Sequence, residues 1–487
     1  MQPYDALTEI FGNDLIIADR DRESRSRELK TYSRDQAGGG ERYHREPSAI
    51  VFPTVTGQVA RLMQWANRTG VPVTPRGAGS GLAAGAVPAP GGVVCSFEKM
   101  NRIIEIDTEN LMVVVEPGVV TNALDTALEP HGLFFAGYPM SEDICFVGGN
   151  VAENAGGGRA VKYGTTAAWV IGAEVVTPTG EILNLGGKRL KDVTGYNLLQ
   201  LFVGSEGTLG LFTRLVIRVI PRPDVRGVIF AAFPTPAAAA QCVAELKRHT
   251  NPSAIEFIDG ETAYRTNEAL PKAQRFALAD GAGAFLLVEF DGDDVSTVTA
   301  MLDRGADITR KHDGAVHASG TGEEATSRSW KLRKQVPWWV KRTAGPHHSV
   351  EDVVVPPSAI PSLVEWVERH RKTGEIPIAL FGHAGDGNFH INPMKPEAMA
   401  AEAWEPALHT LLTALYTEVV RLGGTISGEH GIGRKRAKYL ALALSPAERE
   451  TMKTIKRALD PKNVLNPGVI FPTPEARSAT PRVSTPR

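Results

Sequence analysis

Two short stretches in the last third of the chain contain the residues best suited to bind a metal ion and to move a proton. Residues 381–393 read Phe-Gly-His-Ala-Gly-Asp-Gly-Asn-Phe-His-Ile-Asn-Pro, and residues 427–433 read Ser-Gly-Glu-His-Gly-Ile-Gly. Imidazole and carboxylate groups are common metal ligands, and a catalytic metal keeps one position open for its substrate. The candidate ligands are His383, His390 and Glu429. The candidate catalytic base is His430.

The first stretch predicts a β-hairpin that would bring its two histidines together. Asp386-Gly387 is a preferred type I′ turn, in which both central residues take positive φ. Symmetric pairing about this turn places His383 opposite His390, with Cβ atoms about 4.5–5.5 Å apart, and leaves Asn392 on the same face. The alternative is a structural, hydrogen-bonded histidine pair. The high glycine content favours a ligand site, because small residues lie where a ligand or another backbone approaches closely.

Composition excludes several classes of function. The chain has 487 residues, enough for two to four domains, and a formal net charge of −2. It has no basic run with interleaved aromatic residues, so nucleic-acid binding is not expected. Its three cysteines, Cys95, Cys145 and Cys242, are too few for an iron–sulfur centre and form no disulfide framework, which fits a cytoplasmic location. We find no signal peptide and no apolar run of transmembrane length, so membrane association would require a partner.

Hydrophobic periodicity divides the chain at Pro221-Arg222-Pro223. Before this break, short strands are expected at 49–52, 71–74, 93–96, 112–115, 170–176, 181–185 and 211–220. Thr56 and Thr121 are expected to cap the helices that follow them, the first with Val59, Leu62, Met63 and Ala66 on its apolar face. After the break, longer strand–helix units are expected at 227–233 with 235–249, 284–290 with 295–305, and 353–355 with 358–371, followed by helices at 400–422 and 446–459. This pattern suggests a second α+β domain.

Three glycine-rich loops lie in the first half of the chain, at 75–92, 147–158 and 204–210. The first follows a strand but opens no helix and lacks the last glycine of G-x-G-x-x-G, so it does not fit a Rossmann fold. Its consecutive N–H groups could form a nest for an anion such as a pyrophosphate. Arg76 could assist there, or could be a surface charge. Three such loops beside strands favour a long ligand lying against backbone over three unrelated turns.

These segments resemble a known family. Pro75–Leu82, Pro139–Gly164 and Gly195–Gly210 resemble the FAD-binding domain of the vanillyl-alcohol oxidase superfamily, and the two stretches at 381–393 and 428–433 resemble its FAD-linked oxidase C-terminal domain. Together they resemble the FAD-linked D-2-hydroxy acid dehydrogenases. This group includes D-lactate dehydrogenases, D-2-hydroxyglutarate dehydrogenase and the flavin subunit of glycolate oxidase, which is the most similar in length and motif wording.

The resemblance implies an α+β flavoprotein with two domains. We expect a helical segment at 1–45, an FAD-binding α+β domain at 46–222, and an α+β substrate (cap) domain at 223–430 that is built on an antiparallel sheet and holds the metal site. Residues 431–472 would be a helical segment that returns to the FAD domain. The tail at 473–487 is rich in Pro, Ser, Thr and Arg and is expected to be disordered.

The resemblance also implies residues that bind FAD. The cofactor would be non-covalent, because the histidine that bonds to flavin in some members has no evident counterpart. Residues near the pyrophosphate would be Pro75, Gly77, Gly79, Ser80 and Gly81. Residues along the flavin and its phosphates would be Ser141, Gly148, Gly149, Asn150, Ala155 and Gly156. Glu206, Gly207 and Ile171 would approach the adenosine or ribityl end. The same segments add Arg76, Ala78, Leu82, Pro139, Gly157, Tyr163 and Gly164.

For catalysis, the resemblance implies a divalent metal (Zn, Mn or Fe) at His383, His390 and Glu429. Asn392 and Arg333 would bind the substrate carboxylate, a role that suits the forked guanidinium. The alternative for Arg333 is a solvated helix charge, since other cations surround it. His430 would take the hydroxyl proton while hydride passes to flavin N5, which gives the 2-oxo acid.

Substrate and partners are less defined by the sequence. Family members that oxidise dicarboxylates carry a lysine just before a strand ending in Val-Pro, whereas Ser349–Pro356 has none. This favours glycolate or D-lactate over 2-hydroxyglutarate; Glu351 could be another neighbour of the metal. No nicotinamide motif is present, so the electron acceptor would be a quinone, an electron-transfer flavoprotein or an iron–sulfur subunit, in a homodimer or hetero-complex. The rival hypotheses are a metal-dependent hydrolase, a flavin subunit that only relays electrons, and an alditol- or phenol-type oxidase.

Overall fold

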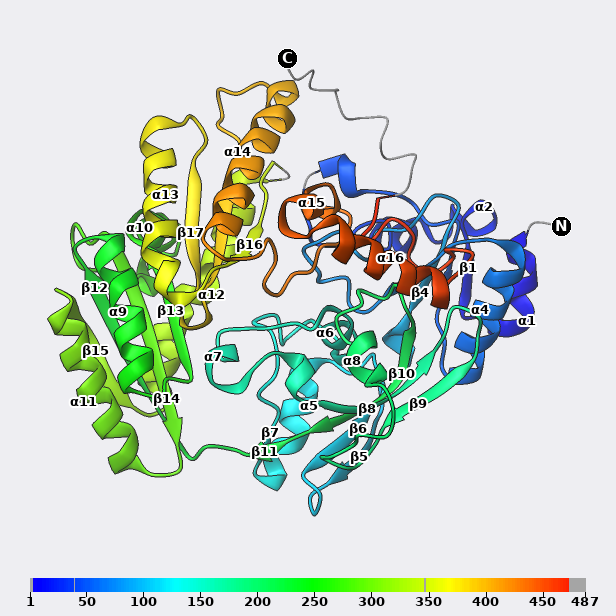
Figure 1. Cartoon of the computed structure of the whole chain (residues 1–487), viewed down its shortest axis with the longest axis horizontal. Coiled ribbons are helices and arrows are strands. Elements are labelled where there is room, and N and C mark those ends of the chain that lie inside the picture. Colours follow the sequence, from blue (N-terminus) through cyan, green and yellow to red (C-terminus); the bar gives the residue numbers. More distant parts are fainter. Residues whose placement is uncertain (1–2, 39, 346, 473–487) are drawn as a thin grey trace.

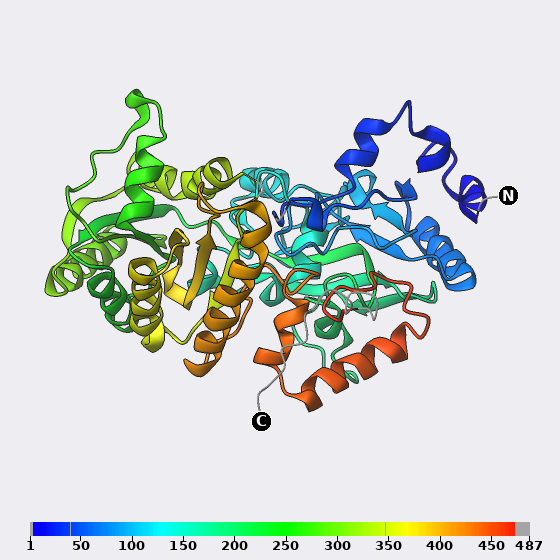
Figure 2. The ribbon, with the colours of Figure 1, turned by 90° about the horizontal axis from the view of Figure 1, so that it is seen from above.

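The computed structural model describes residues 3–38, 40–345 and 347–472, arranged in two lobes (Figure 1). The first lobe contains residues 3–221 and is drawn in blue to green-teal. The second lobe contains residues 222–430, drawn in green to orange. The last described segment, 431–472, lies against the first lobe in both views (Figures 1 and 2). The predicted disordered tail at 473–487 lies outside the described residues.

A four-stranded sheet in the first lobe has the order β1-β2-β4-β3, with β2, β4 and β3 parallel and β1 antiparallel to β2. Its strands are β1 (Leu15–Ile17), β2 (Ala49–Val51), β3 (Val73–Arg76) and β4 (Val93–Ser96). β2 and β4 are almost continuous apolar runs, as strands buried on both faces usually are. The N-terminal segment supplies β1, which the sequence did not predict, together with the short helices α1 (Thr8–Phe11), α2 (Ala18–Asp21) and α3 (Ser26–Thr31).

A five-stranded antiparallel sheet in the same lobe has the order β5-β6-β10-β8-β9. Its strands are β5 (Ile103–Asp107), β6 (Met112–Val115), β8 (Val170–Val176), β9 (Ile182–Gly186) and β10 (Leu211–Arg218). A small pair, β7 (Leu133–Phe134) with β11 (Ile220–Pro221), lies at the passage to the second lobe. The helices of this region are α4 (Thr56–Thr69), α5 (Thr121–Leu128), α6 (Val147–Glu153), α7 (Ala160–Tyr163) and α8 (Leu198–Phe202).

The predicted caps of α4 and α5 are wrong. Both helices begin at the threonine itself, which is the first helical residue, so its side chain cannot act as an N-cap. The two hydroxyls donate to tertiary acceptors instead, from Thr56 Oγ1 to Glu174 Oε1 at 2.6 Å and from Thr121 Oγ1 to the carbonyl of Cys145 at 3.3 Å. The apolar face predicted for α4 is buried, which confirms the period of that helix.

The second lobe is built on a seven-stranded antiparallel sheet with the order β15-β12-β14-β13-β17-β18-β16, as expected. Its strands are β12 (Val225–Phe233), β13 (Ala254–Asp259), β14 (Ala284–Gly292), β15 (Ala315–Thr321), β16 (Glu351–Val354), β17 (Ile378–His383) and β18 (Asn388–Pro393). One face packs on α9 (Pro236–His249), α11 (Val295–Lys311), α13 (Ile360–Thr373) and α14 (Ala401–Arg421). The other face packs on α10 (Gly260–Glu268) and α12 (Glu323–Ala344).

The predicted hairpin exists with a different register. His383 pairs with Asn388 rather than with His390. The connection is a 3-10 turn at Ala384–Asp386, and Gly387 alone of the two expected turn residues has positive φ, at 82°. The register therefore differs from the prediction by two residues, which is the side-chain period of a strand. Both histidines stay on one face, and their ring centroids lie 5.1 Å apart.

The segment after residue 430 contacts both lobes, because Tyr439 joins the core of the second lobe and Ile455 and Leu459 pack on a core of the first. It contains α15 (Leu440–Ala443) and α16 (Pro446–Leu459), drawn in orange-red in Figure 1. Beyond α16, Leu465 forms a parallel bridge with Val73 of β3 and is fully buried in the core of the four-stranded sheet. Lys456 Nζ donates to the carbonyl of Thr208 at 2.8 Å. No helix in the described part of the chain is long and apolar enough to cross a membrane.

Replacing Leu465 by Ala should test this attachment. Leu465 is 0 % exposed, so we expect the substitution to lower the free energy of unfolding by about 2–5 kcal/mol. Urea denaturation followed by tryptophan fluorescence would measure this. The matched control is Leu190→Ala, whose side chain is 68 % exposed and should change stability by about 0.5 kcal/mol or less. Equal effects of the two substitutions would contradict the burial of this segment.

Candidate active site

A cavity of about 540 Å³ lies between the two lobes and brings together residues from most of the predicted site. This volume is in the range of pockets that hold small molecules and cofactors. The predicted cofactor residues that line it are Pro75, Arg76, Gly77, Ala78, Gly79, Ser80, Gly81, Leu82, Pro139, Ser141, Gly148, Gly149, Asn150, Ala155, Gly156, Glu206 and Gly207. The predicted catalytic and metal residues that line it are Arg333, His383, His390, Asn392, Glu429 and His430.

Four predicted cofactor residues do not line this cavity. Tyr163 donates its hydroxyl to Asp291 Oδ2 at 2.9 Å and so ties α7 to the second lobe, and Gly164 ends the same helix. A side chain at Gly157 would collide with the carbonyl of Tyr138, so this glycine permits close backbone packing. Ile171 lies within β8.

Arg76 is neither a surface charge nor a free cation in the cavity. Its side chain is buried, and its Nη1 and Nη2 donate to the carbonyls of Arg34 and Thr31 at 2.8 and 3.3 Å. A side chain at Gly79, which has φ +69°, would collide with this guanidinium. Arg76 therefore lies behind the first glycine-rich loop and fixes it to the N-terminal segment.

The first and second glycine-rich loops leave open space where a ligand can approach. The positions of a Cβ atom at Gly81 and at Gly149 have no protein atom within 4 Å. Glu206, at φ 53°, turns its carboxylate away from its own loop and accepts hydrogen bonds from the backbone N–H groups of Ile432 and Gly433 at 2.8 and 2.6 Å. This contact joins a cofactor loop to the stretch that carries Glu429.

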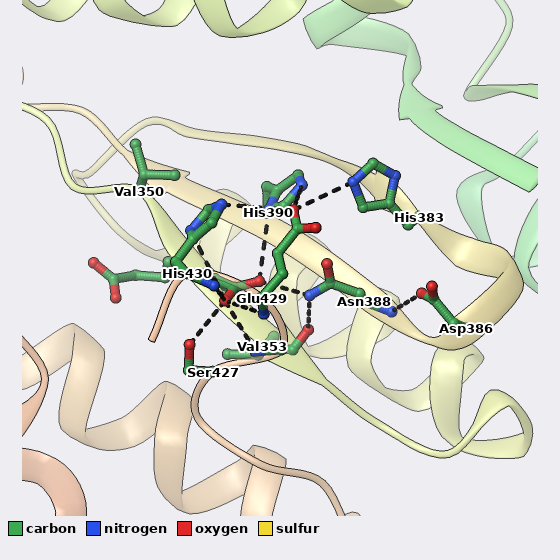
Figure 3. A network of polar contacts seen from close by, with 12 residues as sticks. Val350, Val353, His383, Asp386, Asn388, His390, Ser427, Glu429 and His430 are labelled. Carbon is green, nitrogen blue, oxygen red and sulfur yellow. Dashed lines mark hydrogen bonds and ion pairs between the residues drawn. The ribbon is translucent and has the colours of Figure 1, made fainter. Parts of the chain in front are cut away.

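Glu429 lies at the centre of three imidazoles (Figure 3). Its Oε1 is 3.3, 3.5 and 3.6 Å from the Nε2 atoms of His383, His390 and His430. Zinc–ligand bonds of about 2.0–2.2 Å in a tetrahedral site place neighbouring ligand atoms about 3.3–3.6 Å apart. The spacing of these donors therefore fits a divalent metal ion.

The orientation of His383 supports this interpretation. Its Nδ1 lies 2.7 Å from Glu256 Oε1, while its buried Nε2 has no hydrogen-bond partner among the described residues. A carboxylate at Nδ1 holds the proton there and directs the Nε2 lone pair outward, as in carboxylate–histidine–metal arrangements. Burial lowers the pKa of His383, but the charges of Glu256 and Glu429 outweigh burial and raise it well above its ordinary value. A bound cation would take over this charge compensation.

His390 and His430 share a second carboxylate, Asp352. The two rings are stacked, with centroids 5.2 Å apart and an interplanar angle of 6°. Their Nδ1 atoms lie 3.9 and 3.8 Å from the Asp352 carboxylate. Burial lowers the pKa of His430, and it lowers that of His390 well below its ordinary value. Both rings are therefore neutral near pH 7, with lone pairs available for a metal or a proton.

The sequence interpretation of the acidic pair is wrong about which residue faces the site. Strand alternation directs Asp352 toward the histidines and Glu351 to the opposite face of β16. There Glu351 accepts hydrogen bonds from the hydroxyls of Ser349 and Tyr416 and lies 3.3 Å from Lys435 Nζ. Glu351 is therefore not a neighbour of the metal donors.

Arg333 and Asn392 line the same cavity. Arg333 is 2 % exposed, and its Nε donates to Glu256 Oε2 at 2.6 Å, so the alternative of a solvated helix charge is wrong. This contact uses Nε, and the terminal amino groups can bind an anion that enters the cavity. Asn392 Nδ2 is buried and has no partner among the described residues. These donors suit a carboxylate ligand.

Glu256 is the site residue that sequence reasoning missed. It is fully buried on β13, where one oxygen meets His383 and the other meets Arg333. Burial raises its pKa, but the charges of His383 and Arg333 outweigh burial and hold it below its ordinary value. A single charged residue inside the apolar run Ala-Ile-Glu-Phe-Ile was the available signal, because a buried carboxylate requires partners.

Comparison with known proteins identifies the family. Residues 47–186 match the family described as FAD binding domain, and residues 222–470 match the family described as FAD linked oxidases, C-terminal domain. The chain belongs to the FAD-linked oxidases. The resemblance of the motifs is thereby confirmed, and the chain is an FAD-linked oxidoreductase, which excludes the hydrolase hypothesis.

Relatives in this family oxidise hydroxy acids. The chain is 37% identical over 431 residues to glycolate oxidase subunit GlcD of Bacillus subtilis, covering 88% of this chain and 90% of that protein. It is 36% identical to D-lactate dehydrogenase of Anaerostipes hadrus, covering 87% and 89%. It is 32% identical to D-2-hydroxyglutarate dehydrogenase of Stutzerimonas stutzeri, covering 87% and 91%. The fold is also that of p-cresol methylhydroxylase, with a TM-score of 0.78, 19% identity, and coverage of 97% and 96%.

Filling the cavity at Gly149 should displace FAD without damaging the fold. Gly149 is helical and its Cβ position is open, so Gly149→Leu should leave the apoprotein at least as stable, because leucine is the better helix former. We expect FAD affinity to fall by about 10-fold or more, which corresponds to about 1.4 kcal/mol. Flavin fluorescence titration of the apoprotein measures this.

Gly57→Leu is the matched control for this substitution. Gly57 is also helical with an open Cβ position, but it is exposed and does not line the cavity. FAD binding should be unchanged there. Unimpaired FAD binding by Gly149→Leu would contradict the assignment of this loop to the cofactor.

Proposed function

We propose that the protein oxidises a small D-2-hydroxy acid, glycolate or D-lactate, to the 2-oxo acid. The observation that carries this proposal is the convergence of Glu429 with three imidazole Nε2 atoms on a cavity that the FAD-binding loops also line. Family membership supplies the flavin chemistry, and the names of the relatives support a hydroxy acid as substrate.

Arg333 and Asn392 are the proposed carboxylate-binding residues. Both line the cavity; Asn392 Nδ2 is buried and has no partner among the described residues, and Arg333 uses Nε, not its terminal amino groups, to bind Glu256. The Glu256 carboxylate fixes the guanidinium through Nε, which leaves the terminal amino groups for the ligand. A planar guanidinium held in this way is pre-organised for a carboxylate.

The hydroxyl group of the substrate would then lie beside Glu429 and the imidazoles. His430 takes the hydroxyl proton at Nε2, and the neutral ring that burial favours is ready for this role. A divalent ion held by His383, His390 and Glu429 would polarise the hydroxyl oxygen and lower its pKa. FAD, which the glycine-rich loops would hold, would supply the oxidant that takes the Cα hydrogen with its electron pair as the carbon becomes a carbonyl.

The cavity wall supports a monocarboxylate. Val350, which occupies the stretch where a lysine would bind a second carboxylate, lines the cavity with an apolar side chain, and so does Phe381. Two lysines also line it, but Lys334 Nζ donates to Glu142 Oε1 at 3.0 Å and Lys341 Nζ donates to Gln36 Oε1. Neither lysine is a free partner for a distal carboxylate.

Electrons would leave the reduced flavin for a quinone, an electron-transfer flavoprotein or an iron–sulfur subunit. The Bacillus subtilis relative is named as a subunit, which supports assembly into a hetero-complex; a homodimer is the other arrangement we consider. We propose a cytoplasmic location, with any association with a membrane provided by such a partner.

Anaerobic reduction of the bound flavin tests the proposed function. The visible spectrum of the FAD-loaded protein would be recorded before and after addition of D-lactate or glycolate, with D-2-hydroxyglutarate in parallel. We expect bleaching by a monocarboxylate, with the faster acid as the better substrate. Bleaching by D-2-hydroxyglutarate alone would identify that acid, rather than glycolate or D-lactate, as the substrate. A spectrum that no hydroxy acid changes would favour a flavin subunit that only relays electrons.

Two histidine variants separate the metal ligands from the base. His383→Ala should lower metal affinity by about 10-fold or more, because one of three ligands is lost. His430→Ala should keep both metal and FAD but reduce flavin about 100-fold or more slowly. Metal content by mass spectrometry, flavin absorbance and stopped-flow reduction measure the three quantities. Removal of metal by a chelator should also slow flavin reduction in the unaltered protein, and addition of Zn, Mn or Fe should restore the rate.

The opposite pattern would overturn these assignments. Loss of metal from His430→Ala with retention by His383→Ala would exchange the two roles. Reduction of His430→Ala at the unaltered rate would remove His430 as the base. His409→Ala serves as the control, since His409 is an exposed histidine whose Nδ1 lies 2.9 Å from the Tyr439 hydroxyl and which does not line the cavity.

A further inference from the structure

We propose that Asp352 is a positioning residue of the reaction, a single carboxylate that aligns His390 for the metal and His430 for the proton. This inference rests on the proposed function, because it assigns those two roles to the imidazoles. It adds a residue that does not touch the substrate and acts through its neighbours.

The sheet register places Asp352 between the two elements that it would align. On β16, Asp352 is directly opposite His390 of β18, so their side chains share a face. On its other side Asp352 forms a parallel bridge with Ser427, at the start of the stretch that carries Glu429 and His430.

One oxygen of Asp352 fixes the backbone of that stretch. Oδ2 accepts hydrogen bonds from the backbone N–H groups of Gly428, Glu429 and His430 at 2.9, 2.9 and 2.8 Å, and from Ser427 Oγ at 2.9 Å. Three successive N–H groups directed at one carboxylate leave little freedom for the peptides between them, and unpaired groups at this depth would be costly. The positions of the Glu429 carboxylate and the His430 ring follow from this anchoring.

The two oxygens also face the two imidazoles. Nδ1 of His390 lies 3.9 Å from Oδ1, and Nδ1 of His430 lies 3.8 Å from Oδ2. These distances are too long for hydrogen bonds, so the interaction is electrostatic in this conformation. Neither Nδ1 has a hydrogen-bond partner among the described residues. A carboxylate in this position favours the proton on Nδ1 and leaves both Nε2 lone pairs directed toward Glu429.

The charge of Asp352 also matches what the reaction requires. The substrate O–H bond breaks and an N–H bond forms at Nε2 of His430, while the Cα hydrogen leaves with its electron pair to the flavin and the C=O bond forms. The imidazolium that results lies beside the Asp352 carboxylate and later releases its proton to solvent. Asn388 Nδ2, which donates to Oδ1 at 2.7 Å, further holds the carboxylate in place.

A purely structural role for Asp352 is the competing explanation, and the same strand provides a control. Glu351 is adjacent, equally buried at 0 % exposure, and held by several donors on the opposite face of β16. Replacing either carboxylate by its amide should weaken the strand. Only Asp352 faces the imidazoles, so only its replacement should change the chemistry.

The test compares Asp352→Asn with Glu351→Gln in FAD-loaded protein, at a metal concentration that restores full occupancy. We expect Asp352→Asn to slow anaerobic flavin reduction at saturating hydroxy acid by about 100-fold or more, with KM changed by less than about 3-fold. Its metal affinity, measured without substrate, should fall by about 10-fold. Glu351→Gln should stay within about 3-fold of the unaltered rate and affinity.

A double-mutant cycle shows whether Asp352 acts through His430. In the His430→Ala background the imidazole that Asp352 aligns is absent, so Asp352→Asn should slow reduction by less than about 3-fold. If Asp352→Asn yields no FAD-bound protein, Ser427→Ala takes its place in the same cycle. Ser427→Ala should then slow flavin reduction more in the protein that retains His430 than in the His430→Ala variant.

Three outcomes would overturn the inference. The first is that Asp352→Asn reduces its flavin at the rate of the unaltered protein. The second is that added metal fully restores the rate of Asp352→Asn. The third is that Asp352→Asn slows flavin reduction equally whether or not His430 is present. Failure of the unaltered protein to reduce its flavin would refute the proposed function instead. The metal affinity of Asp352→Asn would still report on the alignment of His390.

Discussion

The site depends on buried carboxylates whose hydrogen-bond donors lie far away in the sequence. An ionised carboxylate is stable in a protein interior only where charges and hydrogen bonds replace its lost hydration. Residues 427–430 donate hydrogen bonds to Asp352, and His383 and Arg333 bind Glu256. Each pairing fixes one side chain that could bind metal or substrate. The contacts that compensate the buried charges are therefore the same contacts that set the geometry of the site.

A third carboxylate extends this principle across the two lobes. Glu206, in a glycine-rich loop of the first lobe, accepts from the N–H groups of Ile432 and Gly433, only a few residues beyond Glu429. Leu465 is buried in the core of the first lobe, so the segment between is held at both ends. The cofactor loops and the imidazole cluster are therefore joined by hydrogen bonds and by buried packing.

Sequence patterns predicted the features that depend on local periodicity. Buried strands such as β6 and β8, and the apolar face of α4, follow from runs and periods of apolar residues. The two histidines share a face although the register was wrong by two residues, because an even shift preserves the side that a residue faces. The cap predictions failed at Thr56 and Thr121, since tertiary acceptors compete for a hydroxyl and sequence does not reveal them.

The supporting carboxylates could not be predicted with the same certainty. Glu351 and Asp352 are adjacent, and the choice between them depends on the phase of β16 relative to β18, which is set by tertiary pairing. Glu256 lies on a strand that the sequence did not reveal, and its partners are more than 70 residues away. The candidate ligands could be selected from the sequence because their residue types are unusual together, whereas a supporting carboxylate is an ordinary acidic residue whose role depends on its place in the fold.

The three histidines of the cluster show how the same side chain acquires different chemistry. Glu256 and Glu429 together raise the pKa of His383, whereas burial dominates for His390 and His430 and lowers theirs. A site that separates the pKa values of neighbouring groups assigns them different protonation states at one pH. His430, neutral and beside a fixed carboxylate, is therefore the ring best prepared to accept a proton, while the two carboxylates around His383 require a positive charge between them. The carboxylates therefore set His383 apart from His390 and His430, which share Asp352.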